Sequence, residues 1–363
     1  MSCNNERGAN QRAGLLHVTN GDTAANLISS SNIGGRVLPW RDPMHHGPFP
    51  GNYSLDEVSR IRLAYLSGDE SCASLIAQNR LQELGCSTSA ELNGFEERNQ
   101  RLSGPSLSEI VFWFEHDLLD QLQLLQLLDF FAHQQSTAPS LSMVCIDEFD
   151  GIDNFRGLGQ LSTEQIASLL PHKTPVTSQQ LDVASKGWAA FCHNSPIELQ
   201  SFLESNQTEL PFLNNALRRH CQEYPWISDG LSRTERQLLG LIKKGVDRPE
   251  QLFVQNMENE SALFIGDSRT YSHLKMLCQE PVPLVLCNGG ANFVHPYEQS
   301  ADASTFNEQR FQLSEFGEQL LAGSGSAATV REYDCWLGGV HLQHYQGMWF
   351  WDDQGGQFTY WKH

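Results

Sequence analysis

The sequence lacks several features that would place it in a common functional class. Basic residues are few: 24 lysines and arginines against 43 acidic residues leave a net charge of −19, which argues against a chain-wide electrostatic hold on nucleic acid or anionic lipid. No apolar run approaches the ~20 residues of a membrane-spanning helix. The first residues show no basic segment followed by an apolar one, so no secretory signal is expected. The nine cysteines are scattered and never form Cys-x-x-Cys, which favours reduced thiols in a cytoplasmic protein.

Common catalytic motifs are also missing. There is no Walker loop, Gly-x-Gly-x-x-Gly, His-Glu-x-x-His or Gly-x-Ser-x-Gly, so no single reaction is indicated. Gly266-Asp267-Ser268 matches the nucleophile block of Gly-Asp-Ser hydrolases, but it does not follow the first strand and has no C-terminal Asp-x-x-His partner. We interpret it as a loop that caps a helix.

What the sequence does contain is an alternation of strand and helix patterns in its first half. Short apolar runs predict strands, and the segments between them carry helical spacing, most clearly from Asp120 to His133. The predicted strands are 15–19, 36–40, 110–114 and 141–146. Pro39 lacks a backbone donor and predicts an edge position or a strand end. We therefore expect an α/β domain over residues 1–158, with a mostly parallel, Rossmann-like sheet and flanking helices.

The second half is predicted to be mainly helical. A helical connecting segment is expected over 159–227, where Ser162 and Gln165 form a capping-box pattern. The C-terminal part, 228–363, resembles a winged helix: a helix capped by Ser232 and Glu235, two further helices, and a strand over 283–287. Residues 228–279 contain seven basic and seven acidic residues and so carry no net charge. A role in packing or protein contact is therefore favoured over DNA binding.

Polar residues gather where the predicted strands end. The first strand runs into Asp22 and Thr23, and the fourth into Asp147, with Arg156 shortly after. The second strand is followed by Arg41, Asp42, His45 and His46, and the third by Glu115, His116, Asp117, Asp120 and Gln121. Because ligands bind outside the carboxyl ends of strands in open α/β sheets, these groups are expected to converge on one edge.

Simpler explanations remain open for individual residues. Asp22 is as well explained as a helix N-cap, and either Asp117 or Asp120 could cap the leucine-rich helix. A loop histidine such as His46 is often merely solvated. Three titratable residues directly after a buried strand are harder to explain in this way, because buried charges need partners, a metal or a substrate.

The residue types favour phosphoryl, nucleotidyl or phosphoester chemistry. Carboxylates suit Mg²⁺ or Mn²⁺, arginines hold phosphate or carboxylate groups, and a histidine transfers protons near neutral pH. The expected metal ligands are Asp22, Glu115 and Asp117. Proton transfer and catalysis are expected from Glu115, His116, Asp117 and His46. The expected substrate-binding residues are Asp22, Thr23, Arg41, Asp120, Gln121 and Arg156.

Several of these stretches, taken together, resemble the bacterial family called domain of unknown function 1835. The segments that carry the resemblance are LHVTNGDTAANL, VLPWRDPMHHGPFP, IVFWFEHDLLDQLQLLQLLDFF and FRGLGQLSTEQIASL. LSRTERQLL, FQLSEFGEQLLAG and WLGGVHL are similar to the helical part that accompanies that domain. The resemblance implies a bacterial cytoplasmic protein with an α/β N-terminal half, and it implies no reaction. Residues 90–108 match nothing in the family and are expected to form a variable loop.

Three hypotheses follow from the sequence. The leading one is an enzyme, a hydrolase or transferase, that acts on a nucleotide or another phosphorylated small molecule. The second is a regulator whose α/β half senses a small molecule and whose C-terminal part contacts DNA, through Arg233 and Arg236, or a protein partner. The third is a scaffold in which the polar cluster is structural. No membrane partner is expected, and the oligomeric state is left open.

Overall fold

The computed structural model describes residues 14–68, 72–78, 89–104, 106–134, 139–279, 281–291, 293–297, 303–344 and 347–362. The chain divides into two compact units, and each is described by itself. Unit 1 comprises Met1–Ala216 with Trp336–Val340, and unit 2 comprises Leu217–Cys335 with His341–His363. The predicted boundary after residue 158 falls inside unit 1, which also holds residues 159–216 of the helical connecting segment.

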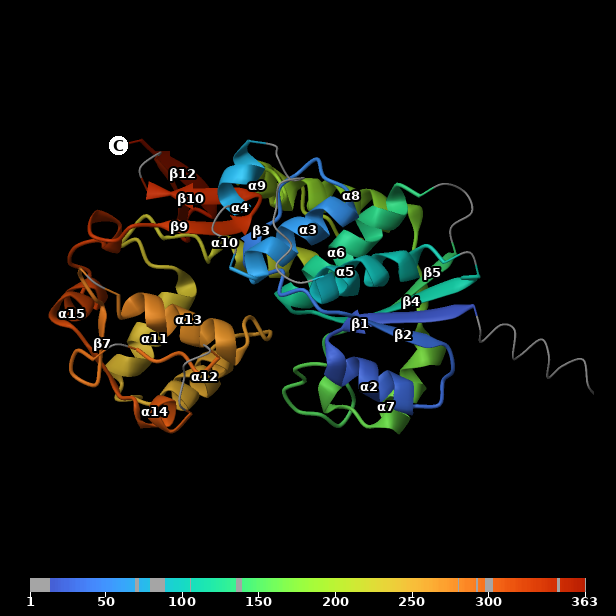
Figure 1. Ribbon diagram of the computed structural model, residues 1–363, viewed down its shortest axis with the longest axis horizontal. Helices are drawn as coiled ribbons and strands as arrows, with labels where there is room; N and C mark the ends of the chain where they lie inside the picture. The colour runs from blue at the N-terminus through green and yellow to red at the C-terminus, as the bar shows by residue number, and fades with distance from the viewer. Residues whose placement is uncertain are drawn as a thin grey trace, which may run out of the picture. The chain divides into compact units, whose positions relative to one another are not determined.

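Unit 1 is built on a five-stranded, mostly parallel sheet with helices on both faces, which confirms the predicted α/β class (Figure 1). The strand order is β2-β1-β4-β5-β6, and only β6 runs antiparallel to its neighbour. Their bounds are β1 (Leu15–Asn20), β2 (Arg36–Trp40), β4 (Glu109–Glu115), β5 (Ser140–Ile146) and β6 (Thr174–Pro175). The strand that contains Pro39 lies at the edge, as its missing donor predicts.

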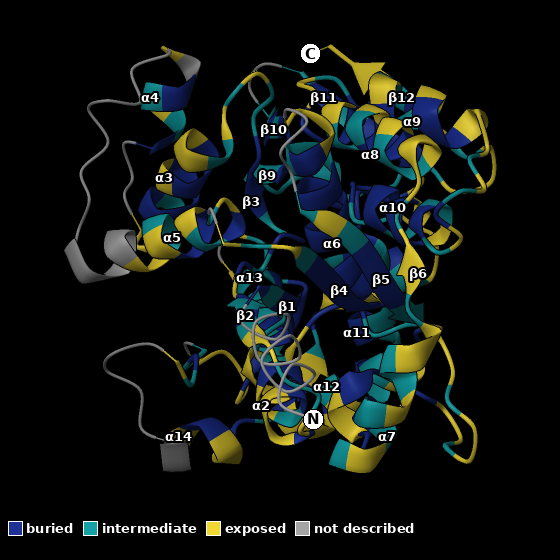
Figure 2. Cartoon of the chain, turned by 90° about the vertical axis from the view of Figure 1, so that its right-hand side faces the viewer, coloured by how far each residue is buried: buried dark blue, intermediate teal, exposed yellow. Residues whose placement is uncertain are grey.

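The central strands of the sheet form the buried layer of the unit, as Figure 2 shows for β4 and β5. Residues 110–114 of β4 are fully buried, as expected for a strand covered on both faces. Helices α2 (Asp22–Ser30) and α7 (Thr163–Leu169) cover one face, where Ile28 and Ile166 pack with Trp113. The other face carries α3 (Leu55–Leu66), α5 (Ser89–Leu102), α6 (Leu118–Ala132) and α8 (Ser178–Phe191) (Figure 1).

The shorter elements of unit 1 connect these layers. The capping box of Ser162 and Gln165 is present at the start of α7, as predicted. The remaining elements are α4 (Cys72–Ala77), η2 (Leu158–Gln160), η3 (Leu170–His172), α9 (Ile197–Glu204) and β3 (Gly47–Pro48), and α10 (Leu213–Cys221) continues into unit 2. Strand β3 pairs in parallel with Leu337 and Gly338 of β9 (Asp334–Gly338).

The expected variable loop over residues 90–108 was wrong, because most of this stretch forms helix α5. Two of its buried side chains, Arg98 and Asn99, are polar, which explains why apolar periodicity missed it. The Arg98 guanidinium lies 3.7 Å from the centre of the Trp40 ring. The amide of Asn99 donates to the hydroxyl of Ser59 on α3 over 2.9 Å. The helix is thus held by buried polar and cation–π contacts as much as by apolar packing.

Unit 2 has three helices followed by a short antiparallel strand pair. They are α11 (Arg233–Lys243), α12 (Pro249–Glu258), α13 (Asp267–Leu277), β7 (Val285–Cys287) and β8 (Phe311–Leu313). The predicted capping box of Ser232 and Glu235 starts α11. Helices α14 (Ala303–Glu308), α15 (Glu315–Leu321) and η4 (Ala327–Thr329), strand β10 (Val340–Gln343) and the hairpin of β11 (Met348–Asp352) and β12 (Gln357–Trp361) complete the chain. The order agrees with the winged-helix expectation, and the resemblance itself stays a prediction.

Two further features concern the described ranges as a whole. No helix in them is both long enough and apolar enough to span a bilayer. None of the cysteines in these ranges forms a disulfide, and Cys72, Cys192, Cys221 and Cys287 are buried.

Candidate functional site

The topology of unit 1 has a switch point at the carboxyl ends of β1 and β4. From β1 the chain proceeds through α2 to β2 on one side of the sheet order, whereas from β4 it proceeds through α6 to β5 on the other. Connections that leave neighbouring strands in opposite directions mark the switch point at which open α/β sheets bind ligands. Asn20 ends β1 and Glu115 ends β4, so both lie at this point.

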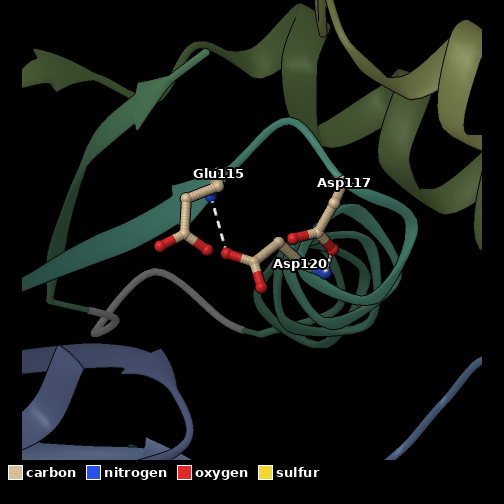
Figure 3. A group of neighbouring side chains, drawn as sticks. All are labelled: Glu115, Asp117 and Asp120. Atoms are coloured by element: carbon tan, nitrogen blue, oxygen red, sulfur yellow. Dashed lines mark hydrogen bonds between the residues drawn. The ribbon is translucent and has the colours of Figure 1, made fainter. Parts of the chain in front are cut away.

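Three buried carboxyl groups meet here: Glu115, Asp117 and Asp120 (Figure 3). Their exposed fractions are 3%, 5% and 0%, respectively. One carboxylate oxygen from each lies within 4.8 Å of the others, and this is the one such group of potential metal ligands within the described ranges. We call these three residues the acid cluster.

Local backbone geometry positions the acid cluster. Glu115 is the last residue of β4, and its backbone N–H donates to Asp120 Oδ2 over 2.6 Å. Asp117 is the N-cap of α6 and accepts a hydrogen bond from the backbone N–H of Asp120 over 3.0 Å. The cap alternative raised for Asp117 is therefore confirmed. An N-cap carboxylate lies close to the first helical turn, so capping also brings Asp117 next to Asp120.

Neighbouring elements complete the frame. The amide of Asn20 donates to Glu115 Oε2 over 2.9 Å and also to Asp120 Oδ1. The backbone N–H of Leu158, at the start of η2, donates to Glu115 Oε1 over 2.5 Å. A Cβ at Gly157 would lie 3.0 Å from the same oxygen, and its φ of +153° favours glycine. Gln121 donates to the Glu115 carbonyl over 2.6 Å, so it positions this strand end.

Burial dominates the electrostatics of the acid cluster. Desolvation raises the pKa of Glu115, and it raises the pKa values of Asp117 and Asp120 well above their usual range. Mutual repulsion adds to this: the Asp120 charge raises the pKa of Asp117, and the Glu115 charge raises that of Asp120. The donors from Asn20 and Leu158 act in the opposite direction. Three adjacent carboxyl groups in this environment must share protons or be neutralised by a cation.

The donor set fits a hard divalent cation. Carboxylate oxygens are the ligands that Mg²⁺ and Mn²⁺ prefer, and each carboxylate has lone pairs beyond those used by the hydrogen bonds above. The metal ligands predicted from sequence need one correction. Asp22 is not in the acid cluster, and Asp120 takes its place.

Asp22 is instead paired with Arg41 on the surface. Nε and Nη2 of Arg41 both donate to Asp22 Oδ1, over 2.9 and 2.6 Å, and the two side chains are more than 60% exposed. The hydrogen bonds from Arg41 lower the pKa of Asp22. Asp22 is the first residue of α2 and points to the end of β2. Gly21, the N-cap, has a φ of +46° and offers no side-chain cap. The first backbone amides of α2 therefore lack a side-chain cap at this edge.

The remaining predicted residues are distributed around this edge. Thr23 is exposed and lies beside Gly159, where an added Cβ would approach its methyl group to 3.2 Å. His116 is partly buried against Phe212, with 6.1 Å between ring centres, and its Nδ1 has no hydrogen-bond partner within the described ranges. Arg156 is partly exposed and directly precedes the Gly157–Leu158 segment. Asp147 at the end of β5 is exposed and outside the acid cluster.

His46 belongs to a packed structural loop. Its ring lies 5.9 Å from that of Tyr65, and its carbonyl accepts a hydrogen bond from Arg62 over 2.8 Å. Arg62 also forms a fully buried ion pair with Asp42 at 2.8 Å and lies 4.2 Å from the centre of the Phe49 ring. These contacts give the loop a structural explanation that the sequence did not reveal.

The structure adds an arginine-lined cavity that the sequence reasoning missed. A cavity of about 600 Å³ lies along edge strand β2, between it and helices α3 and α5. Its lining combines apolar residues such as Leu63 and Phe95 with Arg41, Arg98 and Arg101, against one acid, Glu97. Arg98 is buried, and its Nη1 has no hydrogen-bond partner in the described ranges. Burial lowers the pKa of Arg98 to about 10, which indicates that neighbouring groups neutralise its positive charge only in part.

The cations proposed for DNA contact in unit 2 are engaged within that unit. Arg233 lies 3.0 Å from Glu260, and Arg236 lies 2.5 Å from Asp229 and stacks over Trp226. Arg219 is similarly held by Glu260 at 2.8 Å. Internal ion pairs reduce the positive potential available to a phosphate backbone, so these arginines weaken the DNA hypothesis.

Comparisons with protein-family models and with curated proteins found no match to the chain. The resemblance to domain of unknown function 1835 is untested by them and stays a prediction.

Proposed function

We propose that the chain is an enzyme that acts on a nucleotide or another phosphorylated small molecule, as a hydrolase or transferase. The observation that carries this proposal is the acid cluster at the switch point, where Asn20 and the Leu158 amide orient Glu115. Buried carboxyl groups whose pKa values are raised are typical of functional sites. In this proposal Glu115, Asp117 and Asp120 hold Mg²⁺ or Mn²⁺.

The arginines at the β2 edge support an anionic substrate. In a chain of net charge −19, the arginine-lined cavity concentrates positive charge next to the end of β2. Burial and the nearby Arg36 and Arg41 lower the pKa of Arg101. A bound anion would offset the repulsion between these cations and favour their charged forms. Arg41 already holds the Asp22 carboxylate by two nitrogens, the geometry it would use for a phosphate. The apolar walls suit a base or another apolar group.

Each residue then has a defined task. A bound divalent cation would supply charge neutralisation for the phosphate oxygens. Arg41 and Arg101 would bind the substrate's anionic groups, and the first amides of α2 would orient one phosphate. His116, which lies between Glu115 and Asp117 in the sequence and has a buried Nδ1, would transfer a proton to or from a reacting oxygen.

The first test is a thermal-shift screen of the full chain with nucleotides and phosphorylated metabolites, each with and without Mg²⁺ or Mn²⁺. A ligand at about a hundred times its Kd stabilises by about 2.7 kcal/mol, which shifts the melting temperature by several degrees. Asp117→Asn should weaken the cation dependence, since it removes one ligand charge and keeps a good helix cap. Arg101→Leu should weaken the ligand shift, and Asp182→Asn, on the exposed side of α8, should change neither.

Two results would contradict the proposal. One is the absence of a shift with every ligand on the panel, which would favour the scaffold hypothesis. The other is an equal cation-dependent shift in the Asp117→Asn and Asp182→Asn variants. Once a substrate is known, His116→Ala should leave melting unchanged and abolish turnover, and an unchanged rate would remove the assigned role.

A further inference from the structure

A second cavity in unit 1 lies at the opposite end of α6 from the acid cluster. Its volume is about 610 Å³, within the usual range for small-molecule sites. It is lined by the C-terminal ends of α6 and α8 and by the segment that leads into α3. Asp129 in its wall is nine residues after Asp120, about 14 Å along the helix axis. We call it the aromatic cavity, because Tyr53, Phe130 and Trp188 line it.

The electrostatics of the aromatic cavity favour a positive ligand. Two helices, α6 and α8, end at it, and neither has a basic residue in its last turn. Helix C-termini carry a partial negative charge of about half an electron. The N-terminus of α3 also reaches the cavity at Ser54, but the carboxylate of Glu57 accepts hydrogen bonds from that residue and offsets its positive end. No lysine or arginine is found in the described lining.

One carboxylate faces this negative environment. The Asp129 side chain is 21% exposed, and Nδ1 of His133 lies 3.5 Å from Asp129 Oδ1. Burial raises the pKa of Asp129. Nδ1 of His193, the other imidazole of the lining, lies 3.1 Å from the Ser195 backbone nitrogen and 3.3 Å from the Ser195 carbonyl oxygen. The carboxylate thus lacks a permanent counter-ion within the cavity.

We propose that the aromatic cavity binds a small organic ammonium ion with an aromatic or apolar body. The Asp129 carboxylate and the two helix C-termini would neutralise the ammonium group, while the rings of Phe130 and Trp188 would enclose it and contact its body. Aromatic faces attract organic cations, and an apolar cavity with one charged group both orients and selects its ligand. This site is independent of the proposed enzymatic function, since none of its residues belongs to the acid cluster or the arginine-lined cavity.

The test compares three indole ligands of similar shape and different charge by titration calorimetry on the full chain. The probes are tryptamine, which is cationic at neutral pH, tryptophol, which is neutral, and indole-3-propionate, which is anionic. We expect tryptamine to bind about tenfold more tightly than tryptophol and indole-3-propionate to bind most weakly. Asp129→Asn should reduce tryptamine binding to the tryptophol level, and the exposed-site control Asp182→Asn should leave it unchanged.

Three outcomes would overturn the proposal. Equal affinity for tryptamine and tryptophol would indicate an apolar cavity without charge selection. Unchanged tryptamine binding in a folded Asp129→Asn protein would place the cation elsewhere. Failure of tryptamine and of benzyltrimethylammonium to bind at about 1 mM would remove the site altogether. If Asp129→Asn does not fold, the charge series on the wild-type chain still decides between charge selection and its absence.

Discussion

Replacing Asp117 by asparagine should make the protein less sensitive to rising pH. Asparagine caps helices as well as aspartate does, so the hydrogen bond from the Asp120 amide is kept while one of three crowded carboxyl groups is removed. Burial and the charge of Asp120 raise the pKa of Asp117 well above its usual range, and the Asp117 charge contributes to the raised pKa of Glu115.

The sign and magnitude follow from proton linkage. Between the unfolded pKa of about 3.9 and the raised folded pKa, the folded chain binds more protons than the unfolded chain, so stability falls as pH rises. Each carboxyl group contributes a slope of about 1.4 kcal/mol per pH unit within its window. The variant loses this slope at Asp117, so its advantage over wild type should be small near pH 4 and should grow with pH until the folded pKa is passed.

Urea unfolding followed by tryptophan fluorescence, in the presence of a chelator, measures this difference between about pH 4 and pH 8. The two units can unfold separately, and the affected transition should be that of unit 1. Asp182→Asn, which removes an exposed carboxylate, controls for net charge. A stability difference between Asp117→Asn and wild type that does not change with pH would refute the electrostatic account of the acid cluster.

Three further predictions concern other parts of the chain. Arg62→Met should lower the free energy of unfolding by about 3–5 kcal/mol, because it leaves Asp42 buried without its partner. Adding Asp42→Asn should recover part of this loss in urea unfolding, and the absence of any recovery would argue against the ion pair as the cause. Burial lowers the pKa of His220 to about 3, so the free energy of unfolding of wild type should fall by about 1.4 kcal/mol per pH unit as pH falls below about 6.5. His220→Gln should flatten this dependence on acid pH, and an unchanged slope in the variant would contradict the role of His220. Gly157→Ala should lower the free energy of unfolding by about 1–3 kcal/mol, because residue 157 has a φ of +153° and an added Cβ would meet the Glu115 carboxylate. A melting temperature equal to that of wild type would show that the loop adjusts freely.

The sequence was sufficient to predict four of the five strands of the sheet and to name all three residues of the acid cluster, although Asp120 was expected to bind substrate and not metal. Residues 110–114 form an unbroken apolar run, which is typical of a strand buried on both faces. Glu115 and Asp117 follow it so closely that the strand end places them at the carboxyl edge. The parallel arrangement then makes the switch point predictable, because strand and helix alternate along the chain.

Other parts of the site depend on contacts that one-dimensional patterns do not encode. Asp22 was expected among the metal ligands, but it is the first residue of α2 and faces Arg41, a direction set by the helix start. The donor that Leu158 offers to Glu115 is its backbone amide, which cannot be predicted from the residue type. Arg98 and its helix α5 were missed because their packing is polar and involves Trp40, far away in sequence.

Binding of Mn²⁺ to the purified chain, measured from the electron paramagnetic resonance signal of the free ion, tests whether the acid cluster holds a divalent cation. We expect one Mn²⁺ site in wild type, retention of that site in Asp182→Asn, and at least about tenfold weaker binding in Asp117→Asn, the range seen when ligand sets are disturbed. Addition of the nucleotide or metabolite found by thermal shift should increase the affinity of the wild-type chain for Mn²⁺. Equal Mn²⁺ binding by all three proteins, or none by any of them with and without that ligand, would contradict a divalent-cation site at Glu115, Asp117 and Asp120.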